Sequence, residues 1–267
     1  MYFSQYLSIL LSGHIMSTAS LDIKFAQRLP ANLISNIIYF ILNVVIGLML
    51  VPFFLDSLGT VAYGLIPLAT SITSYITMVI DALNTSISRF LTLDLQRADV
   101  KQANETFNTA LFGTLGIILL MIPVALVAAW YAPMFFNIGD LPTSDVFLLF
   151  ALIFGSVLIR AWSSNFTVTL FAYNRLDLWN YVNIVNLFIQ VMLVVVSFQL
   201  LGPSLALVGL AYIGAATTAL AMAFILSKRT CPNLKIMPAL FVRSRFGEIG
   251  RLSTWVLINT IGWLLNT

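Results

Sequence analysis

Long apolar stretches separated by short polar breaks dominate the chain. Each stretch is long enough to form a helix of about 20 residues, the length that crosses the hydrocarbon core of a bilayer. They cover residues 32–55, 61–88, 106–130, 145–172, 178–200 and 204–227, and a seventh begins near residue 250. This pattern predicts an all-α integral membrane protein, with a six-helix transmembrane bundle followed by the start of a seventh helix.

Polar residues recur at helical spacing within four of the predicted spans. Steps of three and four place each set on one helix face. The rows are Asn32, Asn36, Tyr39, Asn43 and Gly47; Thr70, Ser74, Thr77, Asp81, Asn84 and Ser88; Ser156, Arg160, Ser163 and Thr167; and Asn180, Asn183, Asn186 and Gln190. Such rows either form hydrogen bonds between packed helices or line a hydrated cavity. Four rows in six helices, rich in asparagine, favour the cavity.

Arg160 and Asp81 are the charges that fall well inside predicted spans, away from their ends. A charge deep in a span costs at least about 2.5 kcal/mol, so it normally faces a cavity or a partner. At 1.5 Å per residue, Arg160 lies roughly 21 Å and Asp81 roughly 27 Å along helices that run inward. Two interpretations remain open: an ion pair between these side chains, or an anion-binding arginine with a titratable carboxylate near it.

The end of the chain resembles its first predicted span. Residues 251–266 (RLSTWVLINTIGWLLN) align without a gap on residues 28–43 (RLPANLISNIIYFILN). The polar identities pair Arg28 with Arg251, Asn36 with Asn259 and Asn43 with Asn266. Chance is the alternative in a chain that is 60% hydrophobic. A true repeat indicates a second, parallel unit related by an axis along the membrane normal.

The repeat divides the chain into four parts and predicts that it is a fragment of a longer protein. Residues 1–27 form an N-terminal segment, with Met16 as an alternative start. Residues 28–229 form a six-helix lobe, residues 230–250 a cytoplasmic linker, and residues 251–267 the truncated first helix of a second lobe.

The composition excludes several classes of function. Charged residues make up 9% of the chain, against about 25% in soluble domains, so no soluble domain large enough for an active site is expected. Cys231 and His14 are the only cysteine and histidine, so we expect no metal site, no cofactor and no catalytic residues. A membrane enzyme acting on a lipid carrier would need clustered carboxylates or a usable histidine.

The cations predict the orientation. Of the 13 Lys and Arg residues, all except Arg160 lie before the first span or in breaks on the same side of the predicted bundle. The positive-inside rule then places the N-terminus in the cytoplasm of a multi-pass protein of the cell (plasma or inner) membrane. These cations lie near anionic lipid, so no nucleic acid is needed to explain the net charge of +3.

Three stretches resemble a known family. They are LGTVAYGLIPLA (58–69), DALNTSISRFLTLDLQRADVKQANETFNTAL (81–111) and LFAYNRLDLWNYVNIV (170–185). In these the chain is similar to the polysaccharide and O-antigen flippases of the multidrug/oligosaccharidyl-lipid/polysaccharide exporter superfamily. The resemblance implies two similar lobes around a central cavity, of which this chain supplies the N-terminal lobe.

The resemblance also implies a function, the movement of a polyprenyl-pyrophosphate-linked oligosaccharide across the cytoplasmic membrane by alternating access. Arg160 would contact the pyrophosphate or an acidic sugar, and Asp81 would couple movement to H⁺ or Na⁺. The remaining cavity candidates, which would bond sugar hydroxyls, are Asn36, Asn43, Thr77, Asn84, Asn183, Asn186 and Gln190. Polysaccharide polymerase, glycosyltransferases and membrane lipids are the implied partners. An ion-coupled multidrug exporter of the same superfamily and a non-transporting scaffold are the alternatives.

Overall fold

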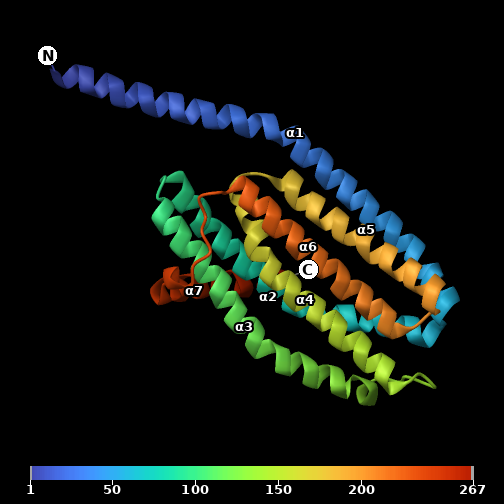
Figure 1. The fold of residues 1–267 in the computed structure, drawn as a ribbon. Helices are drawn as coiled ribbons and strands as arrows, with labels where there is room; N and C mark the ends of the chain where they lie inside the picture. The colour runs from blue at the N-terminus through green and yellow to red at the C-terminus, as the bar shows by residue number, and fades with distance from the viewer. Residues whose placement is uncertain (1, 266–267) are drawn as a thin grey trace.

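The computed structural model describes the backbone of residues 2–265 and the side chains of residues 28–263. The described backbone is helical with short connections (Figure 1). Its elements are α1 (Tyr2–Leu58), α2 (Thr60–Gln96), α3 (Val100–Phe135), α4 (Thr143–Ala172), α5 (Leu176–Leu201), α6 (Leu205–Thr230), a 3₁₀ turn η1 (Pro238–Leu240) and α7 (Arg243–Leu265). Six of these helices are long and apolar enough to cross a membrane, which confirms the predicted fold class.

The spans α2 and α3 are longer than the hydropathy pattern predicts. They have 37 and 36 residues and continue past the apolar stretches as a polar hairpin. The turn between them has Ala98 at φ 55, and Asp99 caps α3 by accepting a hydrogen bond from the Gln102 N–H at 2.9 Å. Loss of hydropathy therefore marks the end of the membrane-crossing part and not the end of the helix.

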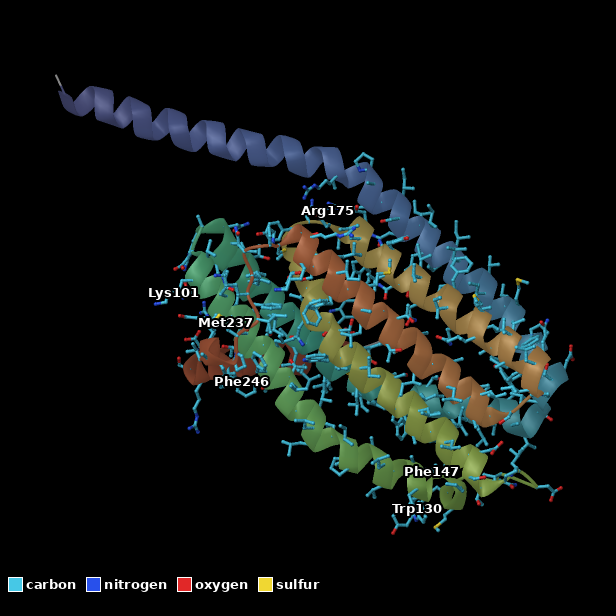
Figure 2. All side chains as sticks on the ribbon, viewed as in Figure 1. Lys101, Trp130, Phe147, Arg175, Met237 and Phe246 are labelled. Atoms are coloured by element: carbon cyan, nitrogen blue, oxygen red, sulfur yellow. The ribbon has the colours of Figure 1, made fainter. Side chains whose placement is uncertain are left out.

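The connections define two ends of the bundle. The turns 97–99 and 173–175 and the segment 231–242 lie at one end, which we call the basic end because the loop cations gather there. Figure 2 shows Lys101 and Arg175 at this end and the Trp130–Phe147 pair toward the other. The rings of that pair stack edge to face at 5.8 Å between centroids, as aromatic residues often do near a membrane interface.

Helix α4 is the centre of the bundle, and half of its most apolar window is buried. It packs closely on α6 at Gly209, where an added Cβ would lie 2.9 Å from the Leu152 Cβ. The outer faces carry exposed large apolar side chains, including Phe40 and Leu48 on α1 and Leu120 on α3. Such faces suit contact with lipid tails.

Helix α7 begins at Arg243, earlier than the start near residue 250 that the apolar pattern predicts, because its first two turns are polar. It lies beside α2 and α3, reached by a segment that runs along α3 (Figure 1). The predictions that concern the side chains of residues 1–27, the Met16 start and Asn266 lie outside the described residues.

Candidate functional site

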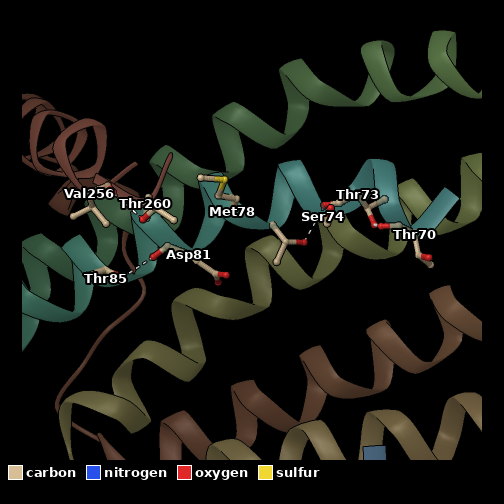
Figure 3. A pocket seen from close by; sticks show the side chains of 10 residues that line it. Thr70, Thr73, Ser74, Met78, Asp81, Thr85, Val256 and Thr260 are labelled. Carbon is tan, nitrogen blue, oxygen red and sulfur yellow. Dashed lines mark hydrogen bonds between the residues drawn. The ribbon is translucent and has the colours of Figure 1, made fainter. Parts of the chain in front are cut away.

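Two neighbouring cavities share one wall of α2. The first, which we call the Asp81 cavity, has a volume of about 390 Å³ and lies between α2 and α7 (Figure 3). The second, the Arg160 cavity, has a volume of about 190 Å³ and lies among α2, α4, α5 and α6. Thr70, Thr73 and Thr77 line both, so the two cavities are adjacent parts of one polar surface.

The Arg160 cavity combines a cation with amides and hydroxyls. Four elements contribute to it, and its lining is Thr70, Thr73, Thr77, Ile153, Ser156, Val157, Arg160, Asn186, Gln190 and Tyr212. Asn186 is 8% exposed, and its side-chain oxygen has no hydrogen-bond partner. A buried acceptor without a partner is uncommon, and this one belongs to a residue that lines the cavity.

Arg160 is exposed and makes no hydrogen bond or ion pair in the part of the chain that the structure describes. The expected alternative of a direct Asp81–Arg160 ion pair is therefore wrong for this structure. The physical reason is that Asp81 lines one cavity and Arg160 lines the other.

The hydroxyl groups of the α2 wall use their protons within their own helix. Thr70 donates to the Ile66 carbonyl at 3.1 Å, Thr73 to Thr70 at 2.7 Å and Thr77 to Thr73 at 3.0 Å. Figure 3 shows the same arrangement for Thr85 and the Asp81 carbonyl. With their donors occupied, these hydroxyls present acceptor lone pairs to the cavities. The wall is therefore rich in acceptors, and Arg160 supplies the charged donors opposite it.

The predicted site residues separate into two groups. Arg160, Thr77, Asn186 and Gln190 line the Arg160 cavity, and Asp81 with Thr77 lines the other. The remaining candidates line neither cavity.

Those remaining candidates are engaged elsewhere. Asn84 accepts a hydrogen bond from the Ser164 hydroxyl at 2.8 Å, between α2 and α4. Asn36 accepts one from Asn180 at 2.7 Å, between α1 and α5. Asn43 and Asn183 bond within their own helices. Interhelical packing, the alternative interpretation of these rows, thus describes Asn36 and Asn84.

Sequence reasoning missed several lining residues. Tyr212 belongs to no polar row of α6, and Thr73 and Thr85 lie off the polar row of α2. Val256 and Thr260 belong to α7, whose position against α2 no spacing within one helix could reveal. Val256 and Thr260 are recognised as lining residues only because α7 packs against the polar row of α2 in the structure.

The described residues contain no group of three or more His, Cys, Asp or Glu side chains arranged to hold a metal ion. The side chains of the two cavities can bind ligands of both charges: a guanidinium and amides suit anions, and hydroxyl oxygens with one carboxylate suit donors or cations.

A membrane protein of Bacillus subtilis is similar in sequence to this chain. The chain is 25% identical over 244 residues to a protein described as "Uncharacterized membrane protein EpsK" of Bacillus subtilis (strain 168). The aligned region covers 90% of this chain and 47% of that protein. No family model matches, and no solved structure matches. The chain thus spans about half the length of that relative. Together with the six apolar helices, this similarity describes a multi-pass membrane protein.

Proposed function

We propose that this chain is one lobe of a transporter that moves a polyprenyl-pyrophosphate-linked oligosaccharide across the membrane by alternating access. The observation that carries the proposal is the unpaired Arg160 in a polar cavity of a membrane bundle. It binds and moves its substrate without chemical conversion, in the manner of a flippase and not of an enzyme.

The state of Arg160 favours an anionic substrate. A guanidinium at mid-span normally pairs with a carboxylate or with backbone carbonyls, yet none lies within bonding distance among the described residues. Arginine binds phosphate through two parallel charged hydrogen bonds. A lipid pyrophosphate supplies the missing partner, and Asn186 and Gln190 lie in the same cavity for the first sugar.

The polar face of α2 supports a passage between two lobes. Ser74, Thr77 and Asp81 are exposed in this bundle, although exposed residues elsewhere on its spans are largely apolar. Hydroxyls and a carboxylate are unfavourable against lipid tails, so this face fits a hydrated interior. A second lobe agrees with the repeated 28–43 segment and with the twofold length of the Bacillus relative.

Asp81 is the candidate for ion coupling, because its carboxylate lies in a hydroxyl-lined cavity without an ion-pair partner among the described residues. H⁺ or Na⁺ is the candidate ion, and the positive-inside rule supports a cytoplasmic basic end. The same carboxylate favours a second candidate function, the ion-coupled export of cationic drugs. In that case Asp81, not Arg160, would contact the cargo.

The test compares substrates in vesicles containing the natural gene product. A fluorescent undecaprenyl-pyrophosphate oligosaccharide in one leaflet reports movement by its accessibility to a quencher. We expect wild-type protein to move it, Arg160→Gln to abolish movement, and Arg160→Lys to retain part of it.

Arg243→Gln is the matched control, because Arg243 is an exposed arginine without a bonded partner among the described residues. Unchanged movement by Arg160→Gln would contradict the proposal. Transport of ethidium that depends on Asp81 and not on Arg160 would establish the drug exporter instead.

A further inference from the structure

The segment between α6 and α7 is held along α3 by two asparagines that bond its backbone. Asn104 donates to the Asn233 carbonyl at 3.1 Å and accepts from the Lys235 N–H at 2.7 Å. Asn108 donates to the Lys235 carbonyl at 2.7 Å and accepts from the Met237 N–H at 2.8 Å. Each side-chain amide thus donates one hydrogen bond and accepts one, as the backbone of a residue in a neighbouring β-strand would.

The geometry explains why this pairing works. Residues four apart on a helix face are separated by about 6 Å along the axis, and two residues of extended chain span about 6.6 Å. The spacing of Asn104 and Asn108 thus matches the repeat of the segment that they bind. The Thr109 hydroxyl continues the row by accepting from the Val242 N–H at 2.9 Å.

A buried ion pair fixes the first turn of α7. Asp94 of α2 is 2% exposed, and both of its carboxylate oxygens accept from Arg245 Nη2 at 3.0 Å. Thr106 of α3 donates to Asp94 Oδ2 at 2.6 Å and accepts from Arg245 Nε at 3.1 Å. The guanidinium also lies 5.0 Å from the centre of the Phe90 ring. Three helices thus meet at one saturated polar cluster.

Phe246, the residue after Arg245, packs against α3. Its ring occupies the space over Gly113 of α3, so that a Cβ added at Gly113 would clash with the ring. Figure 2 shows Met237 and Phe246 beside α3, at the level where the segment meets α7.

Beyond this cluster, α7 packs along α2. Ile249 and Ser253 are the buried residues of its described part. The same helix supplies Val256 and Thr260 to the Asp81 cavity. Any displacement at Arg245 would therefore move one wall of that cavity, about 16 Å further along the helix.

We propose that Asp94, Asn104, Asn108 and Arg245 form a clamp that fixes α7 against α2 and α3 and thereby sets the width of the Asp81 cavity. These are positioning residues, since none of them lines the cavity. The clamp does not depend on the identity of the transported substrate.

The experiment measures how often α7 separates locally from α2 and α3. Ser253→Cys is a near-isosteric probe at a position that is 7% exposed, placed in the full-length protein after removal of the native thiol by Cys231→Ala. The rate of its reaction with N-ethylmaleimide in membranes reports local opening. Asp94→Asn and Arg245→Gln should each raise this rate roughly tenfold or more, because each leaves a buried charge without its partner.

The controls separate clamp release from general loosening. Arg243→Gln, an exposed arginine in the same turn of α7, should leave the rate unchanged. A probe at Ser163→Cys, which is 5% exposed in α4, should not react faster in any clamp variant. The double variant Asp94→Asn/Arg245→Gln should show no more than the effect of one single variant, since the pair acts as a unit.

Asn108→Ala provides an independent test if the charge variants fail to fold. It removes two hydrogen bonds to the segment and should raise labelling at Ser253→Cys several-fold. Unchanged Ser253→Cys labelling in the folded variants would overturn the proposal. Equal increases at Ser253→Cys and Ser163→Cys would also overturn it, because the cluster would then serve only general stability.

Discussion

Asp94 and Asp81 lie on the same helix, yet their surroundings are opposite. Asp94 is buried and receives charged and neutral hydrogen bonds from Arg245 and Thr106. Asp81 is exposed in a cavity and has no ion pair among the described residues.

Arg245 and Arg160 differ in the same way as the two aspartates. Arg245 is bonded by three side chains, and Arg160 by none that the described structure records. The charged groups distinguish the two regions: Asp94 and Arg245 hold helices together at the basic end, and Asp81 and Arg160 make no such bond among the described residues. The identity of a residue alone does not separate these roles.

The largest effect is expected from Asp94→Ala. Removing one partner of a buried ion pair leaves an uncompensated charge and costs about 3–5 kcal/mol, so the melting temperature in detergent should fall sharply. Asp81→Ala is the matched substitution on the same helix and should leave the melting temperature nearly unchanged. Equal losses in the two variants would remove the distinction between the regions.

The reactivity of Cys231 is the next largest effect. This thiol is 1% exposed at the basic end, and burial raises its pKa from 9.0 to about 11. The folded protein therefore prefers the neutral thiol, and this contribution to stability is present below pH 9 and lost as the pH rises through about 11. A shift of this size lowers the thiolate fraction at neutral pH by roughly a hundredfold.

The rate of reaction with a disulfide reagent, measured from pH 7 to 11 in native and denatured protein, checks this prediction. A native rate that rises with an ordinary thiol pKa would show that the basic end opens readily, contrary to a saturated, closed region.

An intermediate effect is expected from Gly113→Ala. The new methyl group would clash with the Phe246 ring, and overpacking of this kind costs about 1–3 kcal/mol. Gly116→Ala lies one turn along the same helix, has nothing within 4 Å of the new Cβ, and should be neutral or stabilising by up to about 1 kcal/mol. Thermal denaturation of the two variants side by side gives the difference, and a Gly113→Ala protein as stable as Gly116→Ala would contradict the packing of α7.

The smallest effect is expected from Arg160→Gln. Because the guanidinium has no bonded partner in the described structure, its removal should change the free energy of unfolding by no more than about 0.5 kcal/mol. Loss of transport without loss of melting temperature is the expected signature. A large loss of stability would instead assign Arg160 to the structural group.

Much of the fold could be predicted from apolar runs, because a bilayer requires each span to be apolar and helical. All six predicted spans correspond to helices α1 to α6. The start of α7 at Arg243 was missed, since its first turns are polar and are held by tertiary bonds to α2 and α3.

The site was only partly accessible to sequence reasoning. Helical spacing brought Thr77 and Asp81 onto one face of α2, but it could not say which rows meet in space. The row of α5 divides, with Asn180 bonded to Asn36 and Asn186 lining the Arg160 cavity. Asn104 and Asn108, which hold the segment before α7, raised no expectation of such a role, because their partners are backbone groups more than 100 residues away.

Side chains of α3 bind backbone groups of the segment 233–237 and not its side chains. Substitution in this segment is therefore limited mainly by the need to keep its backbone N–H groups. The N–H groups of Lys235 and Met237 are bound, so proline is incompatible at those two positions. Proline does occur at 232 and 238, which flank the paired stretch. Asn233, Lys235 and Met237 are exposed, so their side chains are free to vary or to carry a chemical label while α7 keeps its position.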